Sequence, residues 1–244
     1  MTIIIPMAGL SSRFTKGGYT LPKYMLYVKN KSLFSMALGS FNKYFKSANF
    51  VFVARELYDT RRFIDEECKL LGVNNYSVII LKHPTRGQAE TVMEGVRLAG
   101  IKKDESILIF NIDTFRPGFT YPTLMETWDG YLEVFIGNGK NWSYALTESP
   151  TSTRVVETAE KREISNLCST GIYYFKKAGD FVSAYEKMLE SGSSVNEMYV
   201  APLYNYMISL NKNIHVEIIN REEVIFCGTP DEYEEQLKKT CSNR

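Results

Sequence analysis

The chain has 244 residues, of which 44% are hydrophobic and 23% charged, a composition typical of a globular protein with a sizeable core. Its formal net charge is +1, which argues against non-specific binding to nucleic acid or to a membrane surface, so any cationic site has to be local. The four cysteines form no C-x-x-C pair, which argues against a zinc site and favours a reducing cytoplasm. The short N-terminal apolar run lacks a basic leader and is interpreted as a strand, not a signal peptide.

The first half of the chain alternates short apolar runs with amphipathic segments. This alternation predicts right-handed strand–helix–strand crossovers and a Rossmann-like α/β fold, with a mixed, mainly parallel sheet flanked by helices. Ser32 is a plausible N-cap for one of the helices. Strands are predicted at residues 2–7, 50–54, 76–81 and 106–112, and helices at 32–45, 58–71 and 88–99.

The second half has shorter β segments joined by turns, followed by helices. No repeat or flexible linker separates it from the first half, so we expect a single domain, 1–244, with one lobe at about 1–130 and another at about 131–244. A closing helix follows Pro230, which suits a first helical turn. The β segments are predicted at 131–136, 144–146, 154–158, 171–175, 214–219 and 224–226, and the helices at 181–189, 197–210 and 231–239.

The loop after the first predicted strand is built for an anion. It reads AGLSSRF at 8–14, and LPK follows at 21–23. Small residues let backbone N–H groups approach an anion closely, and Arg13 and Lys23 add positive charge. The pattern is neither a P-loop nor a dinucleotide fingerprint. It therefore predicts another kind of nucleotide site, with Ala8, Gly9, Ser11 and Ser12 as candidate nucleotide-binding residues.

Asp113 directly follows the apolar run of the strand predicted at 106–112. A carboxylate at the carboxyl end of a buried parallel strand is well placed to hold Mg²⁺ against phosphate oxygens. The alternative is an aspartate that caps a turn or a helix. The phosphate-type loop at the same edge favours the metal role.

The combination of A-G-x-S-S-R-F with L-P-K resembles the opening signature of the nucleotidyltransferases that make NDP-sugars and related CDP compounds. The resemblance implies the nucleotide-diphospho-sugar transferase fold and a loop that wraps a nucleoside triphosphate. It also implies that Arg13 and Lys23 bind the phosphates and stabilise the charge that develops during transfer. The family's metal-binding aspartate lies at the end of the strand that corresponds to the one before Asp113.

The segment Gly87-Gln88-Ala89 resembles the family's G-[TQ]-A stretch, which contacts the base. Gly87 would allow close backbone approach, and the Gln88 amide can donate and accept; a solvated amide in a first helical turn is the alternative. Members that use UTP or dTTP often have a glutamine upstream of this glycine. Residues 81–83 are Leu-Lys-His here, which leaves cytosine open.

Glu160-Lys161 resembles the family's E-K motif, in which the lysine binds the acceptor phosphate and the glutamate holds other polar groups of the acceptor. A surface charge pair in a hairpin is the alternative. The string STGIYYF at 169–175 resembles the family's G-I-Y-x-F strand and adds Gly171 to the acceptor site. The aromatic run at 197–205 resembles strings near the acceptor site of capsule-cluster members, and core packing is its alternative role.

The segment CGTPD at 227–231 resembles the family's G-T-P-E. Many members carry a second metal-binding aspartate two places before this glycine, where Phe226 stands here. Asp231 is the candidate second metal ligand, although an aspartate in a first helical turn commonly interacts with the helix dipole.

Together these resemblances imply transfer of a nucleoside monophosphate from an NTP to a phosphorylated small molecule, with Mg²⁺ as cofactor. Similarity along the whole chain favours CTP, with phosphoglutamine as the acceptor, in capsular polysaccharide modification. A sugar-1-phosphate acceptor with UTP or dTTP stays open, as does a metal-dependent glycosyltransferase, although that enzyme would need a second carboxylate beside Asp113. A nucleotide-binding regulator would have no use for Glu160-Lys161. The sequence leaves oligomerisation open.

Overall fold

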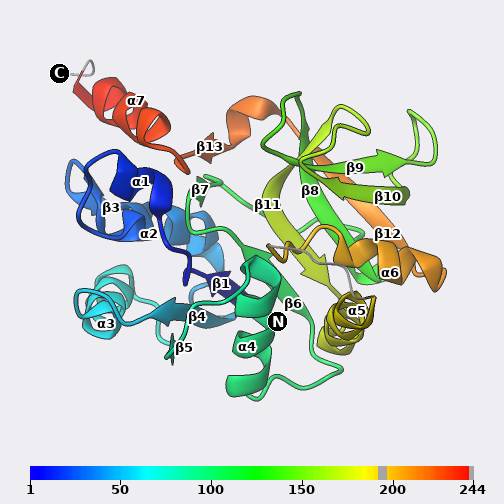
Figure 1. The fold of residues 1–244 in the computed structure, drawn as a ribbon, viewed down its shortest axis with the longest axis horizontal. Coiled ribbons are helices and arrows are strands. Elements are labelled where there is room, and N and C mark those ends of the chain that lie inside the picture. The colour runs from blue at the N-terminus through cyan, green and yellow to red at the C-terminus, as the bar shows by residue number, and fades with distance from the viewer. Residues whose placement is uncertain (192–196, 242–244) are drawn as a thin grey trace.

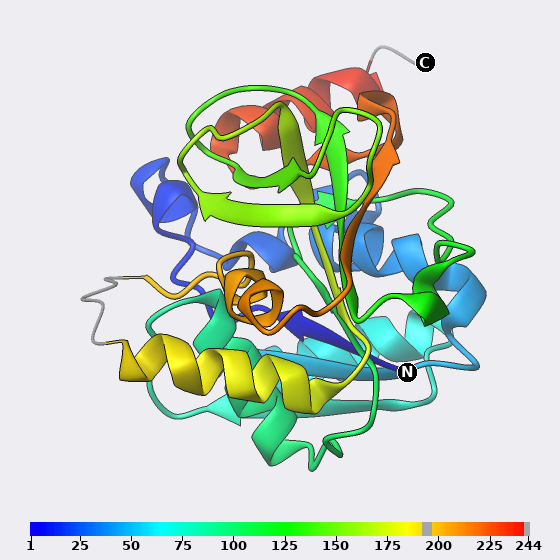
Figure 2. The same cartoon turned by 90° about the vertical axis from the view of Figure 1, so that its right-hand side faces the viewer.

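The computed structural model describes residues 1–191 and 197–241, and Figures 1 and 2 show it from two sides. A nine-stranded sheet forms its centre. The parallel part of this sheet consists, in spatial order, of β6 (Ile107–Phe110), β1 (Thr2–Pro6), β4 (Asn49–Arg55) and β5 (Tyr76–Leu81). All four come from the first half of the chain, as the alternating pattern predicted.

The remaining strands come from the second half and join the sheet through β11 (Leu167–Phe175). This strand pairs antiparallel with β6 and also with β8 (Gly130–Ile136) and β9 (Ser143–Thr147). In turn, β9 pairs with β10 (Val155–Glu160), and β8 pairs in parallel with β12 (Ile214–Ile219). The sheet is therefore mixed, and the expected α/β fold class is confirmed.

Both faces of the parallel part are covered. Ile3 and Ile5 of β1 point into one core cluster, whereas Ile4 points into the other, as the two-residue period of a strand requires. Two helices cover the first face, α2 (Leu33–Leu38) and α3 (Thr60–Leu71). Three cover the second, α4 (Gln88–Leu98), α5 (Ala178–Glu190) and α6 (Leu203–Ser209).

Several short elements gather where β1 and β6 end (Figure 1). They are α1 (Ser12–Lys16), the 3-10 turn η1 (Lys23–Met25), β2 (Tyr27–Val28), β3 (Lys31–Ser32), β7 (Thr114–Phe115) and β13 (Ile225–Phe226), followed by α7 (Pro230–Cys241). Two further 3-10 turns are η3 (Met125–Thr127) and η4 (Arg221–Glu223), of which η4 directly precedes β13. The sequence analysis did not predict β7, which pairs with β13 from the far end of the chain.

The helix predicted at 32–45 is shorter than expected. The α-helix ends at Leu38 and continues as the 3-10 helix η2 (Gly39–Tyr44). The change coincides with Gly39, whose backbone freedom disfavours a regular helix interior. The predicted cap is confirmed, because the Ser35 N–H donates to Ser32 Oγ at 2.9 Å.

The prediction of a helix at 197–210 was wrong for the first part of this segment, because the α-helix begins only at Leu203 and ends at Ser209. Met198 instead makes backbone hydrogen bonds to a distant loop: its N–H donates to Arg86 O, and its carbonyl accepts from Ala89 N, both at 2.9 Å. Pro202 precedes the helix, a position that suits a residue without an N–H. Among the residues that the structure describes, no helix is long and apolar enough to span a bilayer.

Candidate active site

Asp113 follows β6 at the carboxyl end of the parallel strands. Lys23 Nζ lies 2.5 Å from Asp113 Oδ2, and both side chains are only partly accessible, at 22% and 23%. The Cys227 N–H donates to the Asp113 carbonyl at 2.8 Å. Three segments far apart in the sequence therefore meet at this aspartate.

The electrostatic surroundings keep Asp113 ionised. Burial raises the pKa of its carboxyl, but the charge and hydrogen bond of Lys23 outweigh burial, and Arg13 acts in the same direction. The resulting pKa lies below the ordinary value. Asp113 is thus a carboxylate at neutral pH, the form that binds a divalent cation.

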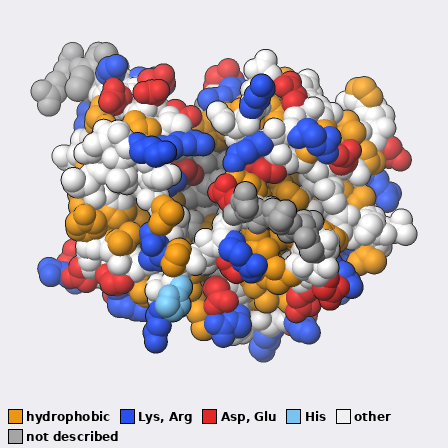
Figure 3. Space-filling model, viewed as in Figure 1, with side chains coloured by type: hydrophobic (Ala, Val, Ile, Leu, Met, Phe, Trp, Pro, Cys, Tyr) orange, Lys and Arg blue, Asp and Glu red, His pale blue; other side chains and the backbone are white. Residues whose placement is uncertain are grey.

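The loop that contains Ala8, Gly9, Ser11, Ser12 and Arg13 extends from the same edge of the sheet. Its start is fixed, because Arg55 Nε donates to Ala8 O at 3.0 Å. Its middle is open: a Cβ on Gly9 would meet nothing within 4 Å, and Ser12 and Arg13 are exposed. Figure 3 shows Lys and Arg side chains on both sides of a hollow on this face. The loop is therefore free to wrap an anion.

Gly87 lies against the backbone of Met198, a contact that the sequence analysis did not predict. Its φ is +152°, a value that other residues rarely adopt, and a Cβ there would lie 2.5 Å from Met198 N. The close approach made possible by this glycine is thus to the Met198 backbone. Contact with a base stays a prediction for Gly87 and Gln88.

The Gln88 side chain reaches the end of β6, where its Nε2 donates to Asn111 Oδ1. A Cβ on Gly171 would overlap the Asn111 amide, so this glycine leaves room for it. Gln88 and Gly171 therefore both lie against Asn111, which precedes Asp113 by two residues in the sequence. The sequence analysis missed Asn111, although a polar residue within an otherwise apolar run was a signal.

Glu160 and Lys161, at the end of β10, make separate sets of contacts. The Ser143 hydroxyl donates to Glu160, and Tyr173 Oη donates to Ser143 Oγ at 3.3 Å. Burial raises the pKa of the Glu160 carboxyl despite this hydrogen bond. Lys161 Nζ instead donates to Tyr199 Oη and lies 3.5 Å from the Glu197 carboxylate.

Charged groups from several segments influence the pKa of the Tyr199 hydroxyl. Burial and the neighbouring Glu197 raise the pKa of its hydroxyl, Glu160 adds to this rise, and Arg13 opposes it. Arg13 therefore acts on Tyr199 as well as on Asp113. Arg13 of the N-terminal loop is thus close enough to influence the pKa of both side chains.

Known structures match this fold along its whole length. A nucleoside-diphosphate-sugar pyrophosphorylase from Vibrio cholerae RC9 is 48% identical in sequence and superposes with a TM-score of 0.92 over 97% of this chain and 99% of that one. The chain belongs to the nucleoside-diphosphate-sugar pyrophosphorylase family of nucleotidyltransferases.

More distant structures share the fold. A UDP-glucose pyrophosphorylase complexed with UDP-glucose has a TM-score of 0.74 at 16% identity, covering 100% of this chain and 99% of that one. The inositol-1-phosphate CTP transferase from T. maritima has a TM-score of 0.72 at 16% identity, covering 99% and 96%. No family model and no curated protein sequence matches the chain.

The place where many nucleotidyltransferases of this family carry a second metal-binding aspartate is occupied by an aromatic side chain. Phe226 pairs with Thr114, next to Asp113, but its ring packs 4.6 Å from that of Trp142 and 5.5 Å from that of Phe135. Phe226 therefore belongs to an aromatic cluster with Trp142 and Phe135 and supplies no ligand.

The candidate second ligand, Asp231, is exposed on the first turn of α7. The next residue, Glu232, caps this helix by accepting from the N–H groups of Gly228 and Thr229 at 2.8 and 3.0 Å. Within 1–191 and 197–241, no group of three or more His, Cys, Asp or Glu side chains is arranged so that it could hold a metal ion. A metal role of Asp231 stays a prediction.

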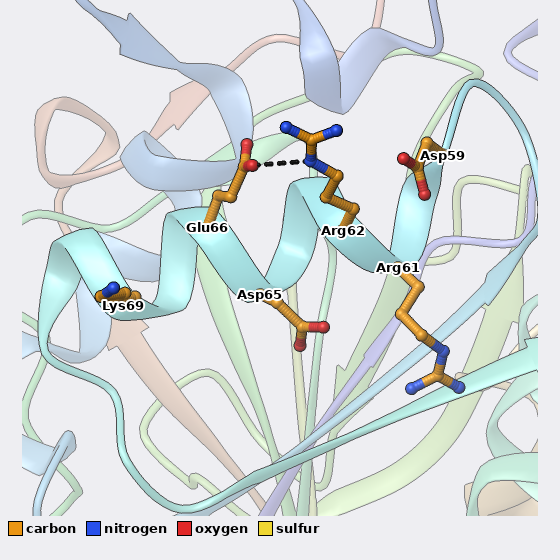
Figure 4. Close-up of a pocket in the computed structure, with 6 residues that line it drawn as sticks. All are labelled: Asp59, Arg61, Arg62, Asp65, Glu66 and Lys69. Carbon is orange, nitrogen blue, oxygen red and sulfur yellow. Dashed lines mark hydrogen bonds and ion pairs between the residues drawn. The ribbon is translucent and has the colours of Figure 1, made fainter.

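A second hollow, of about 340 Å³, lies away from these groups. Its lining comes from Asp59 and the charged face of α3, whose side chains point outward from the helix (Figure 4). Two of these side chains, Arg62 and Glu66, form an ion pair at 2.8 Å one turn apart on α3 (Figure 4). It contains no family motif, so the site at Asp113 is the better candidate.

Proposed function

We propose that this nucleotidyltransferase transfers a nucleoside monophosphate, CMP from CTP in preference to others, to the phosphate of a small-molecule acceptor. Pyrophosphate is released. The observation that carries the proposal is the ion pair between Lys23 Nζ and Asp113 Oδ2, which lie 2.5 Å apart at the carboxyl end of the parallel strands. This pair places a cation that suits phosphate oxygens beside a carboxylate that suits a divalent ion.

The reaction needs no protein nucleophile. An oxygen of the acceptor phosphate, already anionic at neutral pH, attacks the α-phosphorus as the bond to the bridging oxygen of the β-phosphate breaks. Pyrophosphate takes the electron pair of that bond. The enzyme has to align the two anions and neutralise the charge that develops. We assign Arg13 and Lys23 to the triphosphate and Lys161 to the acceptor phosphate.

Mg²⁺ is the cofactor that suits Asp113. Magnesium commonly binds one or two carboxylates and completes its shell with phosphate oxygens and water. Gly228 keeps space beside the carboxylate, because a Cβ there would lie 2.9 Å from Asp113 Oδ2. When bound, the ion would neutralise phosphate charge and polarise the P–O bonds.

The base and the acceptor rest on similarity of sequence. Residues 81–83, Leu-Lys-His, lack the glutamine common in members that use UTP or dTTP. The whole chain resembles the CTP:phosphoglutamine cytidylyltransferase of capsule phosphoramidate synthesis. We therefore propose CTP and phosphoglutamine as substrates in capsular polysaccharide modification, in the cytoplasm, where the buried free thiols of Cys68, Cys168 and Cys227 would stay reduced.

The second candidate is a sugar-1-phosphate nucleotidyltransferase that uses UTP or dTTP. The observation that favours it is the 48% identity to a protein described as a nucleoside-diphosphate-sugar pyrophosphorylase. A metal-dependent glycosyltransferase is less well supported, because the segment Asn111-Ile112-Asp113 supplies one carboxylate.

One experiment separates these candidates. CTP, UTP, dTTP, ATP and GTP are each tested with Mg²⁺ against phosphoglutamine and a panel of sugar 1-phosphates, and pyrophosphate release is measured. CTP carries an amino group, a hydrogen-bond donor, at the ring position where UTP carries a carbonyl group, an acceptor. The wrong base leaves a buried partner unpaired, so we expect at least about tenfold selectivity for CTP in kcat/KM. Equal rates with CTP and UTP, or a preference for dTTP, would contradict the cytidylyl assignment.

A further inference from the structure

Met198 and Tyr199 belong to a short non-helical segment that contacts both the loop 86–89 and Lys161. On one side, the Met198 backbone exchanges hydrogen bonds with Arg86 and Ala89, both at 2.9 Å. Gly87 lies between these partners, in contact with the same peptide. The base-side loop 86–89 therefore cannot shift without moving Met198 or breaking both hydrogen bonds.

On the other side, the neighbouring Tyr199 holds the ammonium group of Lys161. Lys161 Nζ donates to Tyr199 Oη and lies 4.5 Å from the centre of the same ring. Tyr199 Oη in turn donates to the Glu197 carboxylate. Hydrogen-bond and cation–π contacts from Tyr199 and an ionic contact from Glu197 thus define where the charge of this lysine lies.

The backbone of Lys161 is also constrained. Its φ is +56°, in the left-handed region that disfavours a non-glycine residue, and its N–H donates to Trp142 O at 2.9 Å. A lysine side chain is otherwise flexible, and ordering it costs conformational entropy. The contacts with Tyr199 offset that cost before an acceptor arrives.

We propose that Tyr199 is a positioning residue for Lys161, and that Met198 and Tyr199 make acceptor affinity depend on the bound nucleotide. The inference rests on the proposed function, in which Lys161 binds the acceptor phosphate. A nucleotide that orders the loop 86–89 also orders Met198, and hence the ring beside Lys161. By linkage, acceptor binding strengthens nucleotide binding by the same factor.

The test compares Tyr199→Phe, Tyr199→Ala and Lys161→Ala with a matched control, Tyr206→Phe. Tyr206 lies on α6, and its hydroxyl donates to Ser191 Oγ at 3.3 Å. The two probes are phosphoglutamine and glucose 1-phosphate. Each is titrated calorimetrically into the full-length enzyme, with and without the α,β-methylene analogues of CTP and UTP, which cannot react at the α-phosphorus.

In the wild-type enzyme, we expect the nucleotide analogue to raise acceptor affinity by about fivefold or more. Tyr199→Phe keeps the ring but loses the hydroxyl, and it should weaken acceptor binding by about tenfold. Tyr199→Ala should abolish the enhancement by nucleotide while nucleotide affinity measured alone stays within about twofold. In steady-state rates of Tyr199→Ala, the acceptor KM should rise, and the nucleotide KM at saturating acceptor should rise by the lost coupling factor, because linkage is reciprocal.

Two outcomes overturn different claims. If Lys161→Ala leaves acceptor binding intact, the role of Lys161 in the proposed function is wrong. If Lys161→Ala weakens acceptor binding but Tyr199→Ala does not, or if the enhancement by nucleotide survives in Tyr199→Ala, only the positioning role is wrong. Thermal unfolding of every variant shows whether a loss reflects misfolding.

Discussion

Lys23 and Asp113, 90 residues apart in the sequence, form an ion pair with 2.5 Å between Nζ and Oδ2. The pair joins the segment after the N-terminal loop to the end of β6. Both side chains are largely shielded, so each charge depends on the other for compensation. A triphosphate and its cation would compete for these same two groups, because phosphate oxygens attract Lys23 and the cation attracts Asp113.

Asp113→Asn should abolish turnover while the fold survives. Removing the carboxylate eliminates the proposed metal ligand, and we expect kcat to fall by at least about a hundredfold. Pyrophosphate release with Mg²⁺ measures the effect, and circular dichroism checks the fold. Activity within about tenfold of wild type would remove Asp113 from the site.

The variant Asp231→Asn makes a useful comparison in the same assay. A loss similar to that of Asp113→Asn would identify Asp231 as a second ligand. Near-normal turnover would instead assign this exposed carboxylate to the dipole of α7.

Lys23→Ala and Lys161→Ala should fail in different ways. Lys23 is assigned to the triphosphate, so its loss should weaken nucleotide binding, measured by calorimetry. Lys161→Ala should weaken acceptor binding and leave nucleotide binding intact. Each should reduce kcat/KM by about a hundredfold. The exposed Lys46 is a control, and equal losses of nucleotide affinity in both variants would contradict this division of roles.

Gly87→Ala should damage both stability and activity. The new methyl group would lie 2.5 Å from Met198 N and O, at a backbone φ of +152°, so the segment 197–199 or the loop has to move. We expect the free energy of unfolding to fall by more than about 2 kcal/mol. Urea unfolding measures this change.

The matched control is Gly39→Ala. A Cβ at Gly39 meets nothing within 4 Å, and its φ of −56° suits alanine, so this variant should be neutral or slightly stabilising. A Gly87→Ala protein as stable as Gly39→Ala would show that Met198 adjusts without cost, which would weaken the case for coupling through this segment.

The sequence predicted the local features of the fold and site, and it missed those that depend on distant contacts. Strands such as β1 and β6 are continuous apolar runs bounded by loops, so their positions were readable. The pairing of β7 with β13 joins Phe115 to Ile225, which no local pattern can reveal. The non-helical conformation of Met198 likewise depends on hydrogen bonds with a loop more than 100 residues away. The helical spacing of its neighbours therefore gave the wrong prediction.

The buried ion pair between Arg116 and Glu133 allows a prediction about pH. Arg116 Nε lies 3.1 Å from Glu133 Oε1, and the Glu133 side chain is 3% exposed. Burial raises the pKa of Glu133 to about 6, despite Arg116 and a hydrogen bond from Thr170. The native protein then binds a proton at higher pH than the unfolded chain, in which the ordinary value is 4.5.

This group should therefore make the folded state more stable as the pH falls from about 6 to about 4.5, and the gain should be lost again as the pH rises through 6. We expect the free energy of unfolding of the wild type, relative to Glu133→Gln, to rise by about 2 kcal/mol across this window. Urea unfolding of both proteins at several pH values between 4.5 and 7 measures the difference, in which the effects of other carboxylates cancel. A difference that falls with decreasing pH would mean that Arg116 keeps the pKa of Glu133 below its ordinary value.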